Sequence, residues 1–345
     1  MKLRYRPMQS GDVRQCVDVL SKHAVIGPRY GPTVAHLAEV WHRLLRSDPN
    51  LAVVFHAGED EQAPICLFGF SVVVNDDFVL EMKSQPPFWV GPELTRRVIK
   101  GESPILTDKQ LREANSRDGM NLLIWEGCVV PGYEAYTELP RYMMAAFIAV
   151  HQGYLWKEII GVQPESPERL YHTLNTGGFL WDPIAGRYTG GVSKDPDEVV
   201  RTPHIVGVTR ELERGRGGSW AGSWVGALFD YHVPTLGFNR SEQRLLERAL
   251  SGATDEQLAR MLGISLPTAK KMWVSIYNRV EDRLPALVSD PLRSDSPAGS
   301  RGKEKRRGLL AYLREHLEEL RPVSRRLLRN SSSEVLRTQT IERGQ

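Results

Sequence analysis

The chain has 345 residues, of which 41% are hydrophobic and 25% charged, which is typical of a globular protein with room for two domains. Its net charge of +3 is too small to indicate a polyanionic partner, so any contact with nucleic acid must be local. No apolar run approaches the roughly 20 residues that a membrane span needs, and residues 1–10 lack the apolar segment of a signal peptide. We therefore expect a cytoplasmic protein with no membrane partner.

The three cysteines, Cys16, Cys66 and Cys128, lie far apart in the sequence. None belongs to a CxxC pair or to a Cys/His pattern with the spacing of zinc ligands. We expect buried, reduced thiols and no metal site.

Residues 1–190 alternate between predicted strands and helices. Strands are expected at residues 3–8, 51–56, 65–74, 121–130 and 156–162, and helices at residues 11–23, 32–46, 141–153 and 166–174. The helix at 141–153 is apolar almost all round, which predicts that it is buried. A polar segment with prolines, at about residues 76–118, interrupts the pattern.

This order of elements resembles the GNAT acetyltransferase family, and residues 168–179 (ERLYHTLNTGGF) resemble its closing helix and turn. The resemblance implies a mixed α/β sheet with helices. It also implies Glu126 as general base and Tyr171 as general acid. Arg141 and Ala146 match parts of the family's loop for the acyl-CoA pyrophosphate.

That loop departs from the family pattern at Met144, which stands where the family has a glycine. A methionine side chain there would crowd the path of the phosphates. We therefore expect no cofactor and no enzyme activity. The N-terminal domain would instead sense a small-molecule effector or mediate dimerisation. The alternative is an acyltransferase that uses acetyl-CoA or another acyl-CoA.

Residues 213–236 form a predicted linker that is rich in glycine and serine. Its tryptophans, Trp220 and Trp224, would either latch the second domain against the first or belong to a helix docked on the first domain. The sequence does not distinguish these alternatives.

Residues 239–280 contain the signals of three short helices. Start signals are Asn239 with Glu242, Thr254 with Gln257, and Ser265 followed by Pro267; stop signals are Gly252 and Gly263. Helices this short are unstable alone, so they must share one core. A helix–turn–helix is the arrangement we expect.

The third of these helices has two chemically different faces. Ala269, Trp273, Ile276 and Val280 fall on one side, and Lys270, Lys271, Val274, Ser275 and Asn278 on the other. The second face carries no carboxylate, as a helix in the DNA major groove requires. The alternative is a solvated face on a small helical bundle.

The stretch resembles the LuxR-type helix–turn–helix family from residue 238 to residue 280. The matching positions are Glu242, Leu246, Gly252, Leu258, Ala259, Leu262, Ile264, Ser265, Thr268, Lys270 and Ile276. The resemblance implies that Lys270, Lys271 and Val274 contact bases, and that Thr268 and Ser275 lie nearer phosphate. With Ser265 and Asn278 these form the predicted DNA-binding set. The sequence departs from the family at Gln257, Ala269 and Met272, which are packing or capping positions.

The C-terminal residues form a predicted tail with one amphipathic helix at residues 303–320. Its apolar side carries Leu309, Leu310, Leu313, Leu317 and Leu320, and its flanks carry Lys303, Lys305, Arg306, Arg307, Arg325, Arg326 and Arg329. It would serve as a dimerisation or docking helix whose basic flanks grip phosphates, or it would be a solvated tail. Residues beyond 330 are predicted to be disordered.

Together these features predict a transcription regulator with four regions. They are a GNAT-like α/β domain at 1–212, a linker at 213–236, an all-α helix–turn–helix domain at 237–288 and a basic tail at 289–345. We expect double-stranded DNA as partner and a homodimer, because such modules gain specificity by pairing two half-sites. The alternatives are the acyltransferase, with an accessory DNA-binding module, and a protein–protein adaptor that no longer binds DNA.

Overall fold

The computed structural model describes residues 3–46, 50–58, 63–84, 87–161, 164–175, 177–189, 195–215, 225–250, 252–287 and 298–324. They divide into two compact units. Unit 1 comprises Met1–Ala114 and Asp118–Phe229, and unit 2 comprises Asn115–Arg117 and Asp230–Gln345. The domain boundaries expected from the sequence remain predictions.

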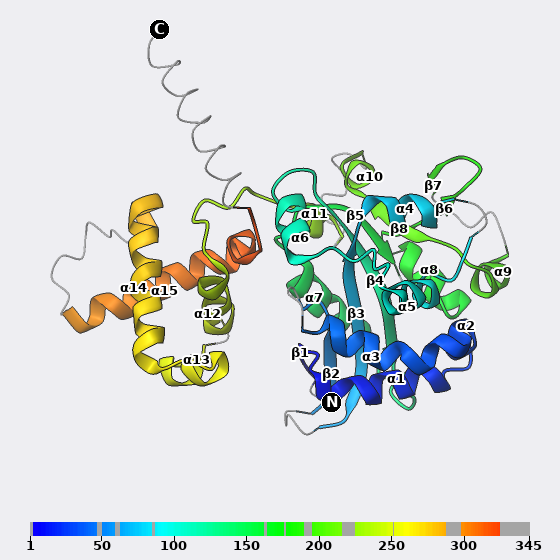
Figure 1. Cartoon of the computed structure of the whole chain (residues 1–345), viewed down its shortest axis with the longest axis horizontal. Coiled ribbons are helices and arrows are strands. Elements are labelled where there is room, and N and C mark those ends of the chain that lie inside the picture. Colours follow the sequence, from blue (N-terminus) through cyan, green and yellow to red (C-terminus); the bar gives the residue numbers. More distant parts are fainter. Residues whose placement is uncertain are drawn as a thin grey trace, which may run out of the picture. The chain divides into compact units, whose positions relative to one another are not determined.

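A mixed β-sheet forms the centre of unit 1 (Figure 1). In the described residues its strands follow the order β1-β2-β3-β4-β5-β8-β6-β7. Their bounds are β1 Leu3–Pro7, β2 Val53–Ala57, β3 Ile65–Val74, β4 Met120–Val129, β5 Trp156–Gly161, β6 Phe179–Asp182, β7 Arg187–Thr189 and β8 Val206–Thr209. The β4–β5 pair is parallel, and the other neighbouring pairs are antiparallel.

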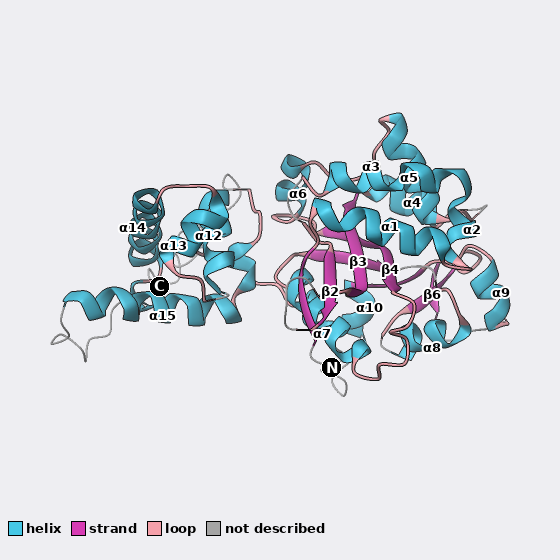
Figure 2. Cartoon of the chain, turned by 90° about the horizontal axis from the view of Figure 1, so that it is seen from below, coloured by secondary structure: helices cyan, strands magenta, loops and turns pink. Residues whose placement is uncertain are grey.

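Helices cover both faces of this sheet. They are α1 Val13–Lys22, α2 Ile26–Tyr30, α3 Val34–Leu44, α4 Asp76–Met82, α5 Val90–Lys100, α6 Asp108–Ala114, α7 Leu139–His151, α8 Pro167–Asn175, α9 Pro196–Arg201, α10 Arg210–Gly215 and α11 Gly226–Phe229. Figure 2 shows α1, α3, α4 and α5 on one side of the sheet, and α7 and α10 on the other. The larger core lies under α1 and α3, where Trp41 stacks on Phe70 with ring centroids 4.3 Å apart. Each face of the sheet is therefore buried, which explains its apolar strands.

The expected order of strands and helices up to α8 is confirmed, but α7 is not the buried helix that its apolar sequence predicts. Only Leu139, Ala146 and His151 of α7 are buried, and Ala145 and Ala149 are exposed. Small residues supply much of its apolar character, and exposing an alanine side chain to water costs little free energy. Three further strands, β6 to β8, extend the sheet beyond the expected elements.

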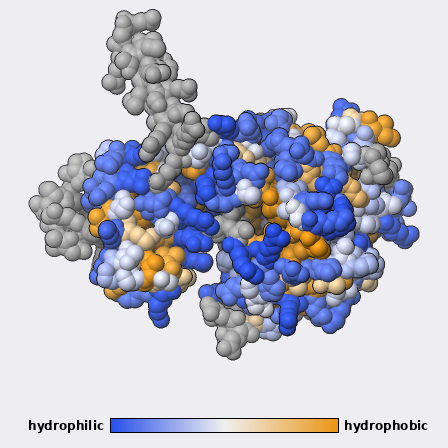
Figure 3. Space-filling view, in the orientation of Figure 1, coloured by the Kyte–Doolittle hydropathy of each residue, from blue (hydrophilic) through white to orange (hydrophobic). Residues whose placement is uncertain are grey.

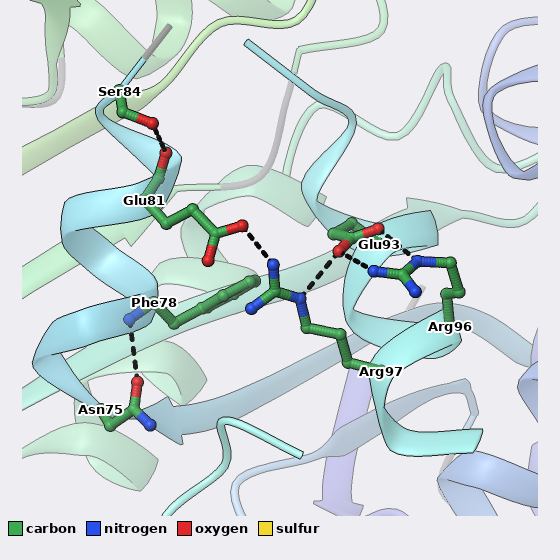
Figure 4. Close-up of polar contacts among 7 residues, drawn as sticks. All are labelled: Asn75, Phe78, Glu81, Ser84, Glu93, Arg96 and Arg97. Carbon is green, nitrogen blue, oxygen red and sulfur yellow. Dashed lines mark hydrogen bonds and ion pairs between the residues drawn. The ribbon is translucent and has the colours of Figure 1, made fainter. Parts of the chain in front are cut away.

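The polar segment between β3 and β4 folds into three helices, α4 to α6. Asn75 begins α4 by accepting a 2.9 Å hydrogen bond from the amide of Phe78 (Figure 4). Arg97 of α5 then joins α4 to α5, since its guanidinium bonds Glu81 and also lies 2.7 Å from Glu93. The side chains of Arg96 and Ser84 complete the contacts drawn in Figure 4. This segment is thus an ordered part of unit 1.

The segment after α10 is only partly described. Val225, Leu228 and Phe229 lie in the core of unit 1 beside β5 and α7. These three residues, at and just before α11, are thus docked in unit 1. Trp220 and Trp224 lie outside the described residues.

Unit 2 contains four α-helices within its described residues: α12 Arg240–Leu250, α13 Asp255–Leu262, α14 Leu266–Arg283 and α15 Ala298–Glu315. The predicted end signals are present. Asn239 caps α12, Thr254 and Gln257 form a capping box on α13, and Ser265 caps α14. Gly252 and Gly263 take the left-handed conformations that end helices, with φ of 85° and 65°.

The leucines of α15 pack into the same core as α12 and α14. Leu309, Leu310 and Leu313 are buried there, together with Leu320 of the short turn Leu317–Leu320 that follows. Glu319 of this turn accepts hydrogen bonds from the amides of Thr235 and Leu236 at 2.7 and 2.9 Å. The leucine face is therefore docked within unit 2. Arg325, Arg326, Arg329 and the residues beyond 330 lie outside the described residues.

On the face shown in Figure 3, hydrophilic side chains cover most of the coloured surface, and apolar ones form separate patches. Within the described ranges, no helix is long and apolar enough to cross a membrane.

Candidate functional site

The outer face of α14 carries the residues predicted to contact DNA. Lys270, Lys271, Val274 and Asn278 are exposed, and Val274 is 57% exposed despite being apolar. The opposite face, made of Ala269, Trp273, Ile276 and Val280, is buried. The two faces therefore divide as the helical periodicity predicts.

The first turn of α14 is fixed by the two hydroxyl residues of the predicted set. The Ser265 side chain accepts a 3.2 Å hydrogen bond from the amide of Thr268, and the two hydroxyl oxygens lie 2.8 Å apart. Both residues are exposed. Ser265 thus acts as a helix cap here, while the remaining donor and acceptor capacity of both hydroxyls faces solvent.

Ser275 differs from its neighbours on α14. Its hydroxyl donates a 2.9 Å hydrogen bond to Glu242 of α12, a residue that is only 2% exposed. Arg279 approaches the same carboxylate at 3.3 Å. Ser275 therefore ties α14 to α12, a role that the resemblance did not imply.

One carboxylate of α13 lies near the cationic face. The pKa of Glu256 is lowered mainly by a backbone hydrogen bond and by the Thr254 hydroxyl. The positive charge of Lys270 lowers it further. Both side chains are exposed. Because an exposed pair of this kind is screened by water and salt, it leaves Lys270 able to contact another anion.

The second candidate centres on Glu126 in unit 1, at the place where β4 and β5 separate. Their described pairing ends at Leu123 and Ile160, although β4 continues to Val129. Glu126 lies on that continuation and is 6% exposed. The Tyr30 hydroxyl donates to its carboxylate at 2.7 Å and accepts from the Trp125 indole at 3.0 Å. Sequence reasoning missed Tyr30, because α2 is distant from β4 in the chain.

Burial raises the pKa of Glu126 to about 7, although the Tyr30 hydrogen bond and the nearby Arg29 guanidinium oppose the shift. Burial also lowers the pKa of Arg29, whose side chain donates to the carbonyls of Pro164 and Val200 and lies over the ring of Trp89. The carboxyl group can therefore hold or release a proton near neutral pH.

The first turn of α5 covers this carboxyl group. The cavity beside Glu126 measures about 30 Å³ and is lined in part by Trp89, Val90 and Gly91. A Cβ placed on Gly91 would lie 3.1 Å from Glu126 Oε1 and 2.4 Å from the Tyr30 hydroxyl. The space is close to that of one water molecule, so an acyl group does not fit in this conformation.

The other residues implied by the GNAT resemblance lie elsewhere. Tyr171 is 47% exposed on α8 and is absent from the described lining of the Glu126 cavity. Arg141 is exposed near the start of α7. Ala146 is fully buried, seven residues after the first residue of α7, Leu139.

The start of α7 does not fit an acyl-CoA pyrophosphate. Only the first four amides of a helix are unbonded within it, so the amides of Met144 and Ala146 are already used. Pro140 has no amide hydrogen. The amides of Tyr133 and Tyr136, before the helix, and of Leu139, its first residue, bond backbone carbonyls. The backbone amides of Met144 and Ala146 are therefore not free to bind a phosphate, and the match of Arg141 and Ala146 to the family's loop stays a prediction.

The thiols and acids offer no further site that the described residues can support. Cys16, Cys66 and Cys128 are free and buried, as predicted. Within the described ranges, no group of three or more His, Cys, Asp or Glu residues could hold a metal ion.

Comparison with known proteins gives no family. No protein-family model matches the chain, and no curated protein matches it. Two solved structures align with 61% of the chain at 10% identity. The loading GNATL domain of CurA from Lyngbya majuscula is covered over 98% of its length with a TM-score of 0.37. The GphF GNAT-like decarboxylase in complex with isobutyryl-CoA is covered over 99% with a TM-score of 0.35.

Proposed function

We propose that this protein is a transcription regulator that binds double-stranded DNA in a sequence-specific manner through α14. The observation that carries the proposal is the exposed face of Lys270, Lys271, Val274 and Asn278 on a helix whose start is capped. No Asp or Glu interrupts these positions between Ser265 and Val280. The LuxR-type resemblance of residues 238–280 supports the same assignment.

The exposed side chains of α14 can contact base edges in the major groove of DNA. Lysine can donate to the O6 and N7 acceptors of guanine, and asparagine can pair with the N6 and N7 edge of adenine. An exposed valine matches the thymine methyl group, which gives a physical reason for Val274 at the surface. Thr268 and Ser265, at the start of the helix, would lie toward phosphate. Ser275 would act by holding α14 on α12.

A homodimer with a GNAT-like unit 1 as its sensor completes the proposal. A single helix reads few base pairs, so two copies on a pair of half-sites would supply the specificity. Unit 1 would bind a small-molecule effector or contribute to dimerisation. The element order of unit 1 supports the GNAT-like assignment.

Genome-wide capture of DNA bound by the tagged, full-length protein tests the proposal. The Lys270→Ala/Lys271→Ala variant is compared with Lys100→Ala/Lys109→Ala, which removes the same charge from exposed positions of unit 1. We expect peaks that share an inverted repeat, lost only in the α14 variant. On a selected site, affinity should fall at least about tenfold, since a base contact contributes about 1–3 kcal/mol.

Two other results would contradict the proposal. Equal loss of binding in both double variants would mean non-specific attraction between a basic protein and DNA. Absence of enriched sites would favour a protein–protein adaptor, whose helical unit does not bind DNA.

A second candidate function, acyl transfer, is favoured by one observation, the raised pKa of Glu126 to about 7 next to the Tyr30 hydroxyl. The start of α7 does not offer a phosphate site, so this candidate ranks below the first. Calorimetric titration with acetyl-CoA separates the two. A saturable heat of acetyl-CoA binding would favour acyl transfer. Absence of such heat would favour the transcription regulator.

A further inference from the structure

A second cavity in unit 1 lies away from Glu126, at the end of β3 that α3 and α6 border. Its volume is about 280 Å³, near the lower end of the range for small-molecule sites. Most of the described residues that line it are apolar, including Leu44, Leu45, Leu51, Val98, Ile105 and Leu111. Such a lining gains free energy by enclosing an apolar body.

The cavity exists because β2 stops short of the end of β3. The β2–β3 pairing ends at Val53 and Gly69, whereas β3 continues to Val74. The next contact along that edge of β3 is the hydrogen bond from the amide of Leu106 to the carbonyl of Val73, at 2.9 Å. Ser71 lies midway between these two points. At Ser71, this edge of β3 therefore has no neighbouring strand among the described residues.

Ser71 presents polar groups to this opening. Backbone groups alternate in direction along a strand, so the amide and carbonyl of Ser71 face the same edge as those of Val73. Within the described part of the chain, no hydrogen bond reaches the Ser71 hydroxyl, and none joins its backbone to a group on this edge. The residue is only 6% exposed and lines the cavity. Buried polar groups normally have hydrogen-bond partners, so these groups of Ser71 suit a ligand that supplies them.

The other polar lining groups are occupied or charged. Asn50 bonds the backbone of Met8 and Ala52, the Thr107 hydroxyl donates to Gln110, and the Ser103 hydroxyl accepts from the amide of Ile105. Arg43, at the end of α3, is exposed and is the one ionisable group among the described lining residues. A cationic group beside an apolar cavity favours an amphipathic anion over a neutral or cationic ligand.

We propose that this cavity binds a small monocarboxylate with an aliphatic or aromatic body. The carboxylate would accept hydrogen bonds from the Ser71 hydroxyl and amide and pair with Arg43. The body would lie among the leucine, valine and isoleucine side chains. This inference deepens the sensor part of the proposed function by naming the effector class. Its test contains no DNA, so failure of one proposal is distinguishable from failure of the other.

Calorimetric titration of the full-length protein with octanoate tests the site, with 1-octanol as the uncharged probe of equal chain length. We expect saturable octanoate binding and at least about tenfold weaker binding of octanol, because a hydrogen bond to a charged group contributes about 1.5–3 kcal/mol. Arg43→Gln should weaken octanoate binding by about the same factor. Ser71→Ala should weaken it several-fold, about 1 kcal/mol for a lost hydrogen bond.

Arg46→Gln is the matched control, since Arg46 is also exposed, lies three residues further on and is absent from the described lining. Its affinity for octanoate should equal that of the unaltered protein. Circular dichroism of each variant checks the fold. Absence of octanoate binding, equal affinity for octanol, or unchanged octanoate affinity in Arg43→Gln or Ser71→Ala would overturn the proposal.

Discussion

The Ser275 hydroxyl and the Glu242 carboxylate are joined by a 2.9 Å hydrogen bond that links α14 to α12. The same carboxylate accepts from the amide of Asn239 at 2.8 Å and pairs with Arg279. Glu242 is thus the reciprocal half of the α12 cap and an anchor for α14. Glu242, which matches the LuxR-type motif, therefore also positions α14, the candidate recognition helix.

Replacement of Glu242 by alanine should destabilise unit 2. The change removes a cap and leaves the Ser275 hydroxyl and Arg279 without their shared acceptor, so we expect a loss of about 2–4 kcal/mol in the free energy of unfolding. Urea denaturation measures it. Glu315→Ala, at an exposed position of α15, is the control and should change stability by less than about 0.5 kcal/mol.

Arg306 should contribute to stability, and its neighbour Arg307 should not. The Arg306 guanidinium donates to Asp255 at 2.7 Å and to the carbonyl of Ala253 at 2.9 Å, and it lies over the ring of Trp273. Arg307 is exposed. Arg306→Ala should cost about 1–2 kcal/mol in urea denaturation, while Arg307→Ala stays within about 0.5 kcal/mol. Equal effects would show that α15 is not held by this contact.

The stability of unit 1 should fall with rising pH because of Glu126. Burial raises its folded pKa from 4.5 to about 7, so between these values the folded protein binds the proton more tightly than the unfolded chain. The contribution is fully present below pH 4.5 and is lost as pH rises through about 7. Relative to Glu126→Gln, the unaltered protein should lose at most about 3 kcal/mol between pH 5 and 8. A pH-independent difference would mean that Glu126 is ionised throughout.

Gly91 should be intolerant of a side chain. A Cβ there would lie 2.4 Å from the Tyr30 hydroxyl, which is held by Trp125 and Glu126, so the neighbour cannot move freely. Gly91→Ala should destabilise unit 1 by about 1–3 kcal/mol. Gly11→Ala, where nothing lies within 4 Å of the added carbon, is the control and should be neutral or slightly stabilising. Thermal denaturation of both variants gives the comparison.

Helix α5 borders the cavity at Glu126 and the cavity at Ser71. Its first turn covers Glu126, and Val98 near its end lines the cavity at Ser71. The sequence predicted only a polar interruption at about residues 76–118, because the prolines and charges of this segment obscure the apolar spacing of its helices. Arg97 illustrates the reason, since its partners Glu81 and Glu93 lie on two helices that only folding brings together.

Features that depend on neighbours along the chain could be predicted from the order of the residues alone. Helix caps such as Ser265 and Thr254, the stop at Gly263, and the division of α14 into two faces all follow from local geometry. The tertiary fold brings distant groups together: Tyr30 with Glu126, Ser275 with Glu242, and Arg306 with Trp273. It also decided that the amides aligned with a phosphate loop lie inside α7. A hydrogen bond or a cavity depends on positions in space, and residues 96 places apart, such as Tyr30 and Glu126, share no local pattern that fixes their distance.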